Sequence, residues 1–324
     1  MSAPDVDYRA TSERPSWEAV PPALQDALAV ALGTEIAGVA PPVRSGFTGG
    51  FAAPARLADG RRVFIKASDN TLHSYGAYQR EAVVVPQLPS AAQAPAIVAT
   101  AHTEDWFAVV SEWVDGRMPG TPWTAEDFTT VTARCEALAE AMTPSPIDGL
   151  DTFLSDFESA EALVVPRQIL SGDRQVPERL QPWVRRILPE LADLVDLAPE
   201  ALKGTAATHA DLRPDNLLID ATGTCWTVDW NWLALGPRWI DWVGLLPIVQ
   251  HHGIDTSAAI RTSPLTADVP ADELDCFAAL VAAYMLKNPD TPPPTGTTQA
   301  LREHQRFYAW TFLDWLATRR GWTT

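Results

Sequence analysis

The sequence predicts an α+β protein of two lobes, a smaller β-rich lobe in residues 1–113 and a larger, mainly helical lobe in residues 114–324. Strand-like segments and the Asp59-Gly60 hairpin signal fall in the first third of the chain. Farther along, apolar residues recur at helical spacing, most clearly in ALAEAMT, RILPELADLV and DELDCFAALVAAYML. With 324 residues, the chain is long enough to bury a substantial core.

The elements expected in the N-terminal lobe follow from local patterns. Residues 21–33 have the apolar spacing of a short helix and end at a glycine. From residue 43 a glycine-containing loop leads into a strand, the hairpin and the lysine-bearing strand RRVFIKAS. Residues 73–88 predict a helix interrupted near Pro86, and residues 106–114 predict another buried strand.

The charge balance limits the class of partner. The chain has 24 basic and 41 acidic residues, a net charge of −17, which disfavours a nucleic-acid binder with a basic face. An acidic surface suits a cationic small molecule, but it is also an ordinary means of staying soluble. The longest uncharged stretch, residues 82–101, contains three prolines, which argues against a membrane helix.

Cysteine usage and the first residues of the sequence indicate a compartment. Charges stand near the N-terminus where a signal peptide would need an apolar segment. An odd number of widely spaced cysteines without a CxxC pair predicts reduced, mostly buried thiols, and hence a cytoplasmic protein, at Cys135, Cys225 and Cys276.

A cluster of polar residues precedes a short apolar segment in HADLRPDN, residues 209–216. The segment continues into a turn and a second short strand that ends at Asp229, so a hairpin is expected here. Such a hairpin would bring Asp211 and Asn216, before its first strand, close to Asp229. Carboxylate and amide oxygens suit Mg²⁺, with Asn216 and Asp229 as its ligands and Asp211 free to deprotonate a hydroxyl.

These residues resemble the motif of the aminoglycoside phosphotransferase family, small-molecule kinases with a protein-kinase-like fold. The likeness rests on His209, Asp211 and Asn216, with the family's spacing of five between aspartate and asparagine, and on Asp229 in VDWNW. The resemblance implies that Asp211 is the catalytic residue. It also implies that Asn216 and Asp229 bind magnesium, and that the cofactors are ATP, or GTP, and Mg²⁺.

The resemblance extends to the first lobe. It implies that the first lobe binds the nucleotide and that the second lobe is the catalytic and substrate-binding lobe. SGFTGGF resembles the loop that covers the phosphates, and SEWVDG resembles the hinge that holds the purine. VFIKAS resembles the strand with the phosphate-binding lysine, and YQREAVV resembles the helix with the glutamate that pairs with this lysine. The cofactor-binding residues implied are Ser45, Gly46, Thr48, Gly49, Gly50, Lys66, Glu81, Ser111 and Trp113.

Three further residues lie in or near the motif. Asp241 corresponds to a buried aspartate that braces the catalytic loop in the family, and His209 is expected to be structural. For Arg213 two roles stay open, neutralising phosphate or pairing with Asp229. The adjacent histidines His251 and His252 are not expected to form a metal site, because their side chains should diverge and no third ligand has a suitable spacing.

The sequence does not identify the acceptor molecule. The family builds acidic acceptor sites in the helical lobe, but a solvated helix face explains equally well the acidic residues found there, Asp151, Asp156, Glu303 and Asp314. A kinase of an aminoglycoside, sugar, amino sugar, choline-like alcohol, nucleoside or other natural product fits the same motif. A nucleotide-binding protein without transfer activity is the alternative from another class. The absence of GxxxxGK[ST] disfavours a P-loop kinase, and a metallohydrolase would leave Lys66 and Glu81 unexplained.

Overall fold

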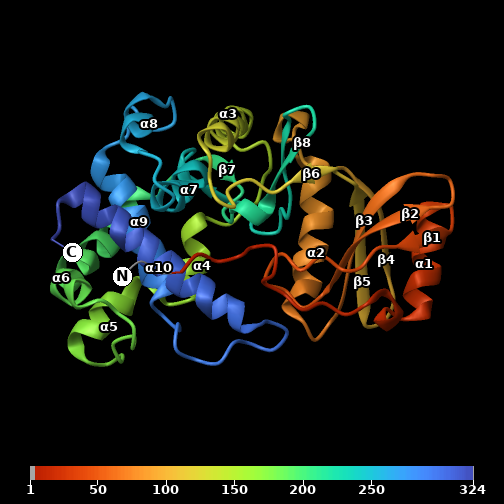
Figure 1. Ribbon diagram of the computed structural model, residues 1–324, viewed down its shortest axis with the longest axis horizontal. Helices are drawn as coiled ribbons and strands as arrows, with labels where there is room; N and C mark the ends of the chain where they lie inside the picture. The colour runs from red at the N-terminus through yellow and green to blue at the C-terminus, as the bar shows by residue number, and fades with distance from the viewer. Residues whose placement is uncertain (1–3, 324) are drawn as a thin grey trace.

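A computed structural model describes residues 4–323, in two lobes joined side by side (Figure 1). The N-terminal lobe contains an antiparallel sheet of five strands in the order β1-β2-β3-β5-β4. The α+β, kinase-like fold predicted from the sequence is confirmed. The strands are β1 Ile36–Val39, β2 Phe51–Leu57, β3 Arg62–Asp69, β4 Ile97–His102 and β5 Trp106–Glu112.

The sheet lies between two helices, α1 (Pro22–Leu32) and α2 (His73–Val84) (Figure 1). Helix α1 buries three leucines at a spacing of four residues, which places them on one face against the sheet. It ends at Gly33, whose φ of 69° is the left-handed conformation that glycine adopts without strain. The predicted leading helix and the helix interrupted near Pro86 are both confirmed, the second continuing as a 3-10 turn at Val85–Gln87.

The predicted hairpin joins β2 to β3, with Lys66 opposite Ala52 in the register. Strands β1 and β4 were not predicted, and both are edge strands of the sheet. Both are short and mostly intermediate or exposed, with one buried position in β4 and none in β1, whereas the central strand β3 has four. Edge strands give a weaker sequence pattern because one side of the strand has no neighbour to bury it.

The chain passes between the lobes after β5, which is where we place the boundary of the two proposed lobes, residues 1–113 and 114–324. The second lobe is mainly helical, with its core between α6, α9 and α10. Its helices are α3 Ala125–Ala141, α4 Phe153–Ser159, α5 Val165–Ser171, α6 Pro182–Ala201, α7 Ile240–His251, α8 Ser257–Thr262, α9 Ala271–Met285 and α10 Gln299–Arg320. Its short strands are β6 Gly116–Arg117, β7 Ala206–Thr208, β8 Leu217–Asp220, β9 Cys225–Thr227 and β10 Ala234–Gly236. The three cysteines are buried and free, as predicted.

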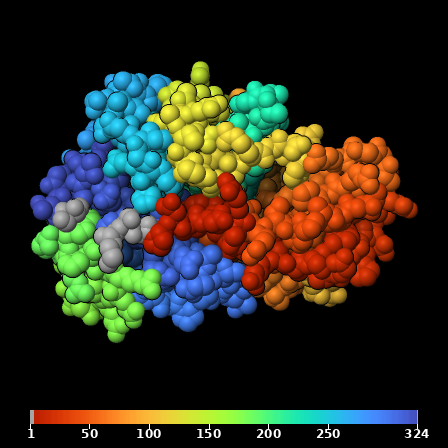
Figure 2. Space-filling view, viewed as in Figure 1, coloured from red at the N-terminus to blue at the C-terminus, as the bar shows by residue number. Residues whose placement is uncertain are grey.

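Residues 4–16 form an irregular segment with a turn at residues 8–11, here called the N-terminal arm, that runs across the junction of the lobes (Figure 2). No helix or strand was predicted from the sequence for these residues. The structure buries Tyr8, Thr11 and Ser12 almost completely, so the arm is packed against the protein. Among the described residues, no helix combines the length and the apolar character that crossing a membrane requires.

Candidate active site

Three charged side chains from distant parts of the chain meet between the lobes. The Lys66 ammonium, on β3, lies 2.9 and 2.7 Å from the two carboxylate oxygens of Glu81 on α2. It also lies 2.7 Å from Oδ1 of Asp229, which follows β9 in the other lobe. The sequence predicted the pair of Lys66 with Glu81, and the structure adds Asp229 to it.

Burial and mutual attraction oppose each other in this group. Burial disfavours the charged form of Lys66, but the charges of Asp229 and Glu81 outweigh it and raise the pKa of the lysine. Burial also raises the pKa of Glu81. Although burial acts on Asp229 in the same direction, the charge of Lys66 holds the pKa of Asp229 below its usual value. Asp229 therefore keeps its negative charge next to the lysine.

Asp241, at the start of α7, holds the loop that carries Asp211. The two carboxylate oxygens of Asp241 accept hydrogen bonds from the backbone N–H groups of His209, at 2.8 Å, and Ala210, at 2.9 Å. Ala210 has φ of 66°, an unfavourable conformation for alanine that these bonds stabilise. His209 is fully buried and its Nε2 donates to the Val228 carbonyl at 2.9 Å. These contacts agree with the structural roles expected for Asp241 and His209.

The hairpin of β8 and β9 brings the remaining site residues together, as predicted. Leu217 pairs with Thr227. The neighbouring residues Asn216 and Val228 are also joined, because the Val228 N–H donates to the Asn216 carbonyl at 3.0 Å. The Asn216 side-chain amide donates to the Asp211 carbonyl at 2.8 Å, which leaves its own oxygen available. Asp211, Asn216 and Asp229 consequently line one cavity.

Arg213 pairs with Asp211 and Asp215, and not with Asp229. Its Nη1 lies 2.5 and 2.7 Å from the two oxygens of Asp211, and its Nε lies 3.1 Å from Asp215. One of the two roles left open by the sequence is therefore wrong, because the arginine is bound by the carboxylates within two residues of it. Burial raises the pKa of Asp211, while the charge of Arg213 acts in the opposite direction.

The glycine-containing loop is attached to the N-terminal arm. The Arg14 guanidinium donates to the carbonyls of Ser45, at 2.8 Å, and Gly50, at 2.7 Å. No pattern in the sequence predicted this contact. A Cβ at Gly49 would lie 2.5 Å from the carbonyl oxygen of Gly296, so the close approach of the loop before α10 requires glycine here.

A cavity of about 830 Å³ lies between the lobes. Of the predicted cofactor-binding residues, it is lined by Ser45, Gly46, Thr48, Gly49 and Lys66. Gly50 is packed against α2 instead, and a Cβ on it would be 2.9 Å from the side chains of Ser74 and Tyr78. Ser111 and Trp113 are not among the described residues that line the cavity, and the Trp113 ring stacks on Phe64, which does line it.

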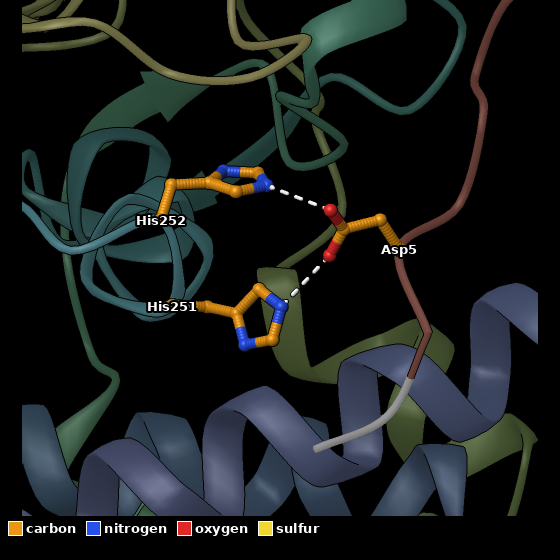
Figure 3. Close-up of side chains that lie close together, drawn as sticks. All are labelled: Asp5, His251 and His252. Atoms are coloured by element: carbon orange, nitrogen blue, oxygen red, sulfur yellow. Dashed lines mark hydrogen bonds and ion pairs between the residues drawn. The ribbon is translucent and has the colours of Figure 1, made fainter.

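His251 and His252 contact the N-terminal arm. Figure 3 shows Asp5 between the two imidazoles, with its oxygens 2.8 Å from Nε2 of His251 and 3.5 Å from Nε2 of His252. The two reasons given from the sequence against a metal site, diverging side chains and no suitably spaced third ligand, are wrong, because the ligand atoms of Asp5, His251 and His252 all lie within 4.8 Å of one another. The direct contacts attach the arm to the helical lobe without requiring an ion.

A lysine, a helix glutamate and an aspartate that follows a β-hairpin, brought together between two lobes, define the protein-kinase-like class of phosphotransferases. The sequence matches the phosphotransferase enzyme family over residues 48–273, more than half of the chain, and the protein belongs to this family. It is therefore an enzyme of the small-molecule kinase class, as predicted. No curated protein matches the chain significantly in sequence.

Solved structures resemble this one in fold at low sequence identity. The GDP and kanamycin complex of APH(2")-IIia has a TM-score of 0.60 and 14% identity, over 91% of this chain and 97% of that one. An aminoglycoside phosphotransferase from Alicyclobacillus acidocaldarius has a TM-score of 0.55 and 15% identity, over 90% and 95%. Choline kinase LicA from Streptococcus pneumoniae has a TM-score of 0.52 and 13% identity, over 82% and 89%. These similarities concern the fold.

Proposed function

We propose that this enzyme transfers the γ-phosphoryl group of ATP or GTP to a hydroxyl group of a small molecule. The observation that carries the proposal is that Lys66 contacts both Glu81 and Asp229, while Asp211 and Asn216 line the same cavity. Phosphoryl transfer depends mainly on positioning and on neutralising negative charge, and this arrangement supplies both. The cytoplasm stays the predicted location, where both nucleotides are available.

Each residue has a defined part in this reaction. Lys66, held by Glu81, binds the α- and β-phosphates, and the glycine-containing loop covers the nucleotide with Ser45, Gly46, Thr48, Gly49 and Gly50. The hinge around Ser111 and Trp113 is proposed to hold the purine. Asp211 orients the acceptor hydroxyl and takes its proton as the acceptor oxygen bonds to phosphorus and the nucleoside diphosphate leaves.

Magnesium fits the donors in this site. Asn216 retains a free amide oxygen and Asp229 stays ionised, and Mg²⁺ prefers such oxygen ligands. When bound, the ion would neutralise charge on the phosphates. Asp229 also contacts Lys66, so the residue that would hold the ion lies next to the residue that would hold the phosphates.

The experiment is an assay of ADP or GDP release with magnesium, either nucleotide, and a panel of aminoglycosides, sugars, nucleosides and choline-like alcohols. Acceptor-dependent release that Asp211→Ala abolishes, with nucleotide affinity preserved, would support the kinase. Nucleotide binding with no release for any acceptor would favour a protein that binds nucleotide without transferring phosphate. Near-normal turnover in Asp211→Ala would remove this residue from the catalytic role.

A further inference from the structure

The half of the cavity beyond Asp211 has a wall of aromatic rings. Helices α4, α9 and α10 contribute these rings from three separated parts of the sequence. Neighbouring ring centres are 5.0 to 6.3 Å apart, so the rings form one continuous series. In order along the wall, they are Tyr308, Phe312, Phe277, Phe153, Phe157 and Tyr284.

These rings also contribute to the protein core, but two of them leave part of their surface for a ligand. Phe153 and Phe277 are 4% and 3% exposed, whereas Phe157 and Tyr284 are only partly buried. The aliphatic side chains of Val281, Met285 and Leu301 extend the same wall. The surface that faces the acceptor is therefore mostly apolar, which is typical of sites that bind a ring face.

Few charges on this wall can balance a cation. Among the lining residues of α4, α7, α9 and α10, the carboxylates are Asp156 and Asp241, and Asp241 is already bonded to the backbone of the catalytic loop. Of the other acidic residues considered from the sequence, Asp151, Glu303 and Asp314 do not line the cavity. Burial lowers the pKa of His304, so this lining residue is neutral and adds no charge.

An acceptor with several ammonium groups is poorly matched to such a wall. Each ammonium group removed from water needs a carboxylate or several hydrogen-bond acceptors, because an unpaired buried charge is costly. Asp211 is available only in part, since Arg213 contacts both of its oxygens. Asn231 offers a neutral polar atom: it is buried and lines the cavity, and in the part of the chain that the structure describes its Oδ1 has no hydrogen-bond partner.

Building on the proposed kinase function, we propose that the acceptor is a hydroxyl-bearing small molecule with an apolar ring face and no more than one cationic group. Its ring face would lie against Phe157 and Tyr284, and a single amine would lie near Asp156 at the exposed edge of the wall. Its reacting hydroxyl would point to Asp211, and Oδ1 of Asn231 would accept one hydrogen bond from a different donor group of the acceptor. This class of acceptor differs from a polycationic aminoglycoside.

The test measures binding and transfer separately, using para-nitrophenyl glucoside, phenylethanolamine, glucose and kanamycin. Binding is measured by calorimetry with magnesium and a non-hydrolysable ATP analogue present, and transfer is measured by ADP release. We expect the two aryl compounds to bind at least about tenfold more tightly than glucose or kanamycin, the effect of one good aromatic contact. Phe157→Ala should weaken aryl binding about tenfold while leaving the affinity for the nucleotide unchanged.

Phe128→Ala is the matched control. Phe128 is a partly buried aromatic of the same lobe, stacked on Trp242 and outside the cavity lining, so its truncation should leave aryl binding unchanged. Kanamycin binding equal to or tighter than aryl binding would overturn the proposed class. So would aryl binding that is as strong in Phe157→Ala as in the parent protein, or absent in both. Aryl binding together with no ADP release for any acceptor of the wider panel would instead contradict the kinase function and leave the ligand class standing.

Discussion

Replacing Lys66 by methionine tests the charge group at the centre of the site. Methionine has a similar length and no charge, so Lys66→Met leaves Glu81 and Asp229 facing each other without their shared cation. The side chains of Lys66, Glu81 and Asp229 are 15%, 8% and 30% exposed. Breaking a buried ion pair by removing one partner costs about 3 to 5 kcal/mol, and the partial exposure of Asp229 favours the lower value, about 3 kcal/mol.

The loss should depend on pH in a defined direction. Burial already raises the pKa of Glu81 above 4.5, and without Lys66 it should rise further. A carboxyl group whose pKa is higher in the folded than in the unfolded protein destabilises the fold above its folded pKa. This penalty disappears as the pH falls below the unfolded value. The difference in unfolding free energy between parent and variant should therefore shrink from about pH 8 to about pH 5.

The assay is urea unfolding at both pH values, followed by tryptophan fluorescence and by circular dichroism, whose agreement tests for a single transition. Lys203→Met is the control, because the Lys203 pair with Glu200 lies at the surface, with side chains 68% and 81% exposed. Removal of an exposed pair should have little effect on stability. A loss below about 1 kcal/mol for Lys66→Met, or one independent of pH, would refute the reasoning from buried charge.

Three more substitutions test the attachments of the site. Arg14→Ala removes the guanidinium that bonds two carbonyls of the glycine-containing loop, and should raise the KM for nucleotide about tenfold with little change in acceptor KM in steady-state titrations. Asp241→Asn places an amide donor against backbone N–H groups; unfolding experiments should show a loss of about 1 to 3 kcal/mol, and turnover should fall. Asp5→Ala removes the contacts with His251 and His252, and should speed hydrogen exchange in residues 4–16; unchanged exchange would mean that other contacts hold the arm.

The sequence by itself determined the parts of the site whose geometry is local. The hairpin after HADLRPDN follows from a turn between two short apolar segments, and its pairing brings Asn216 next to the segment that ends at Asp229. The kinase-like fold was predicted from the resemblance of HADLRPDN and the N-terminal motifs to a known family. Pairing within a hairpin and helical periodicity depend on residues close together in the sequence, so a sequence reveals them directly.

Only the tertiary structure decided which distant groups meet. It joined Asp229 to Lys66, placed Arg14 on the glycine-containing loop, and brought Asp5 to His251. It also gathered the rings of α4, α9 and α10 into one wall, although in the sequence they look like ordinary core residues. Such contacts depend on how whole elements pack against one another, and many packings satisfy the same local pattern of apolar and polar residues. The proposed acceptor side of the site is built almost entirely from contacts of this kind.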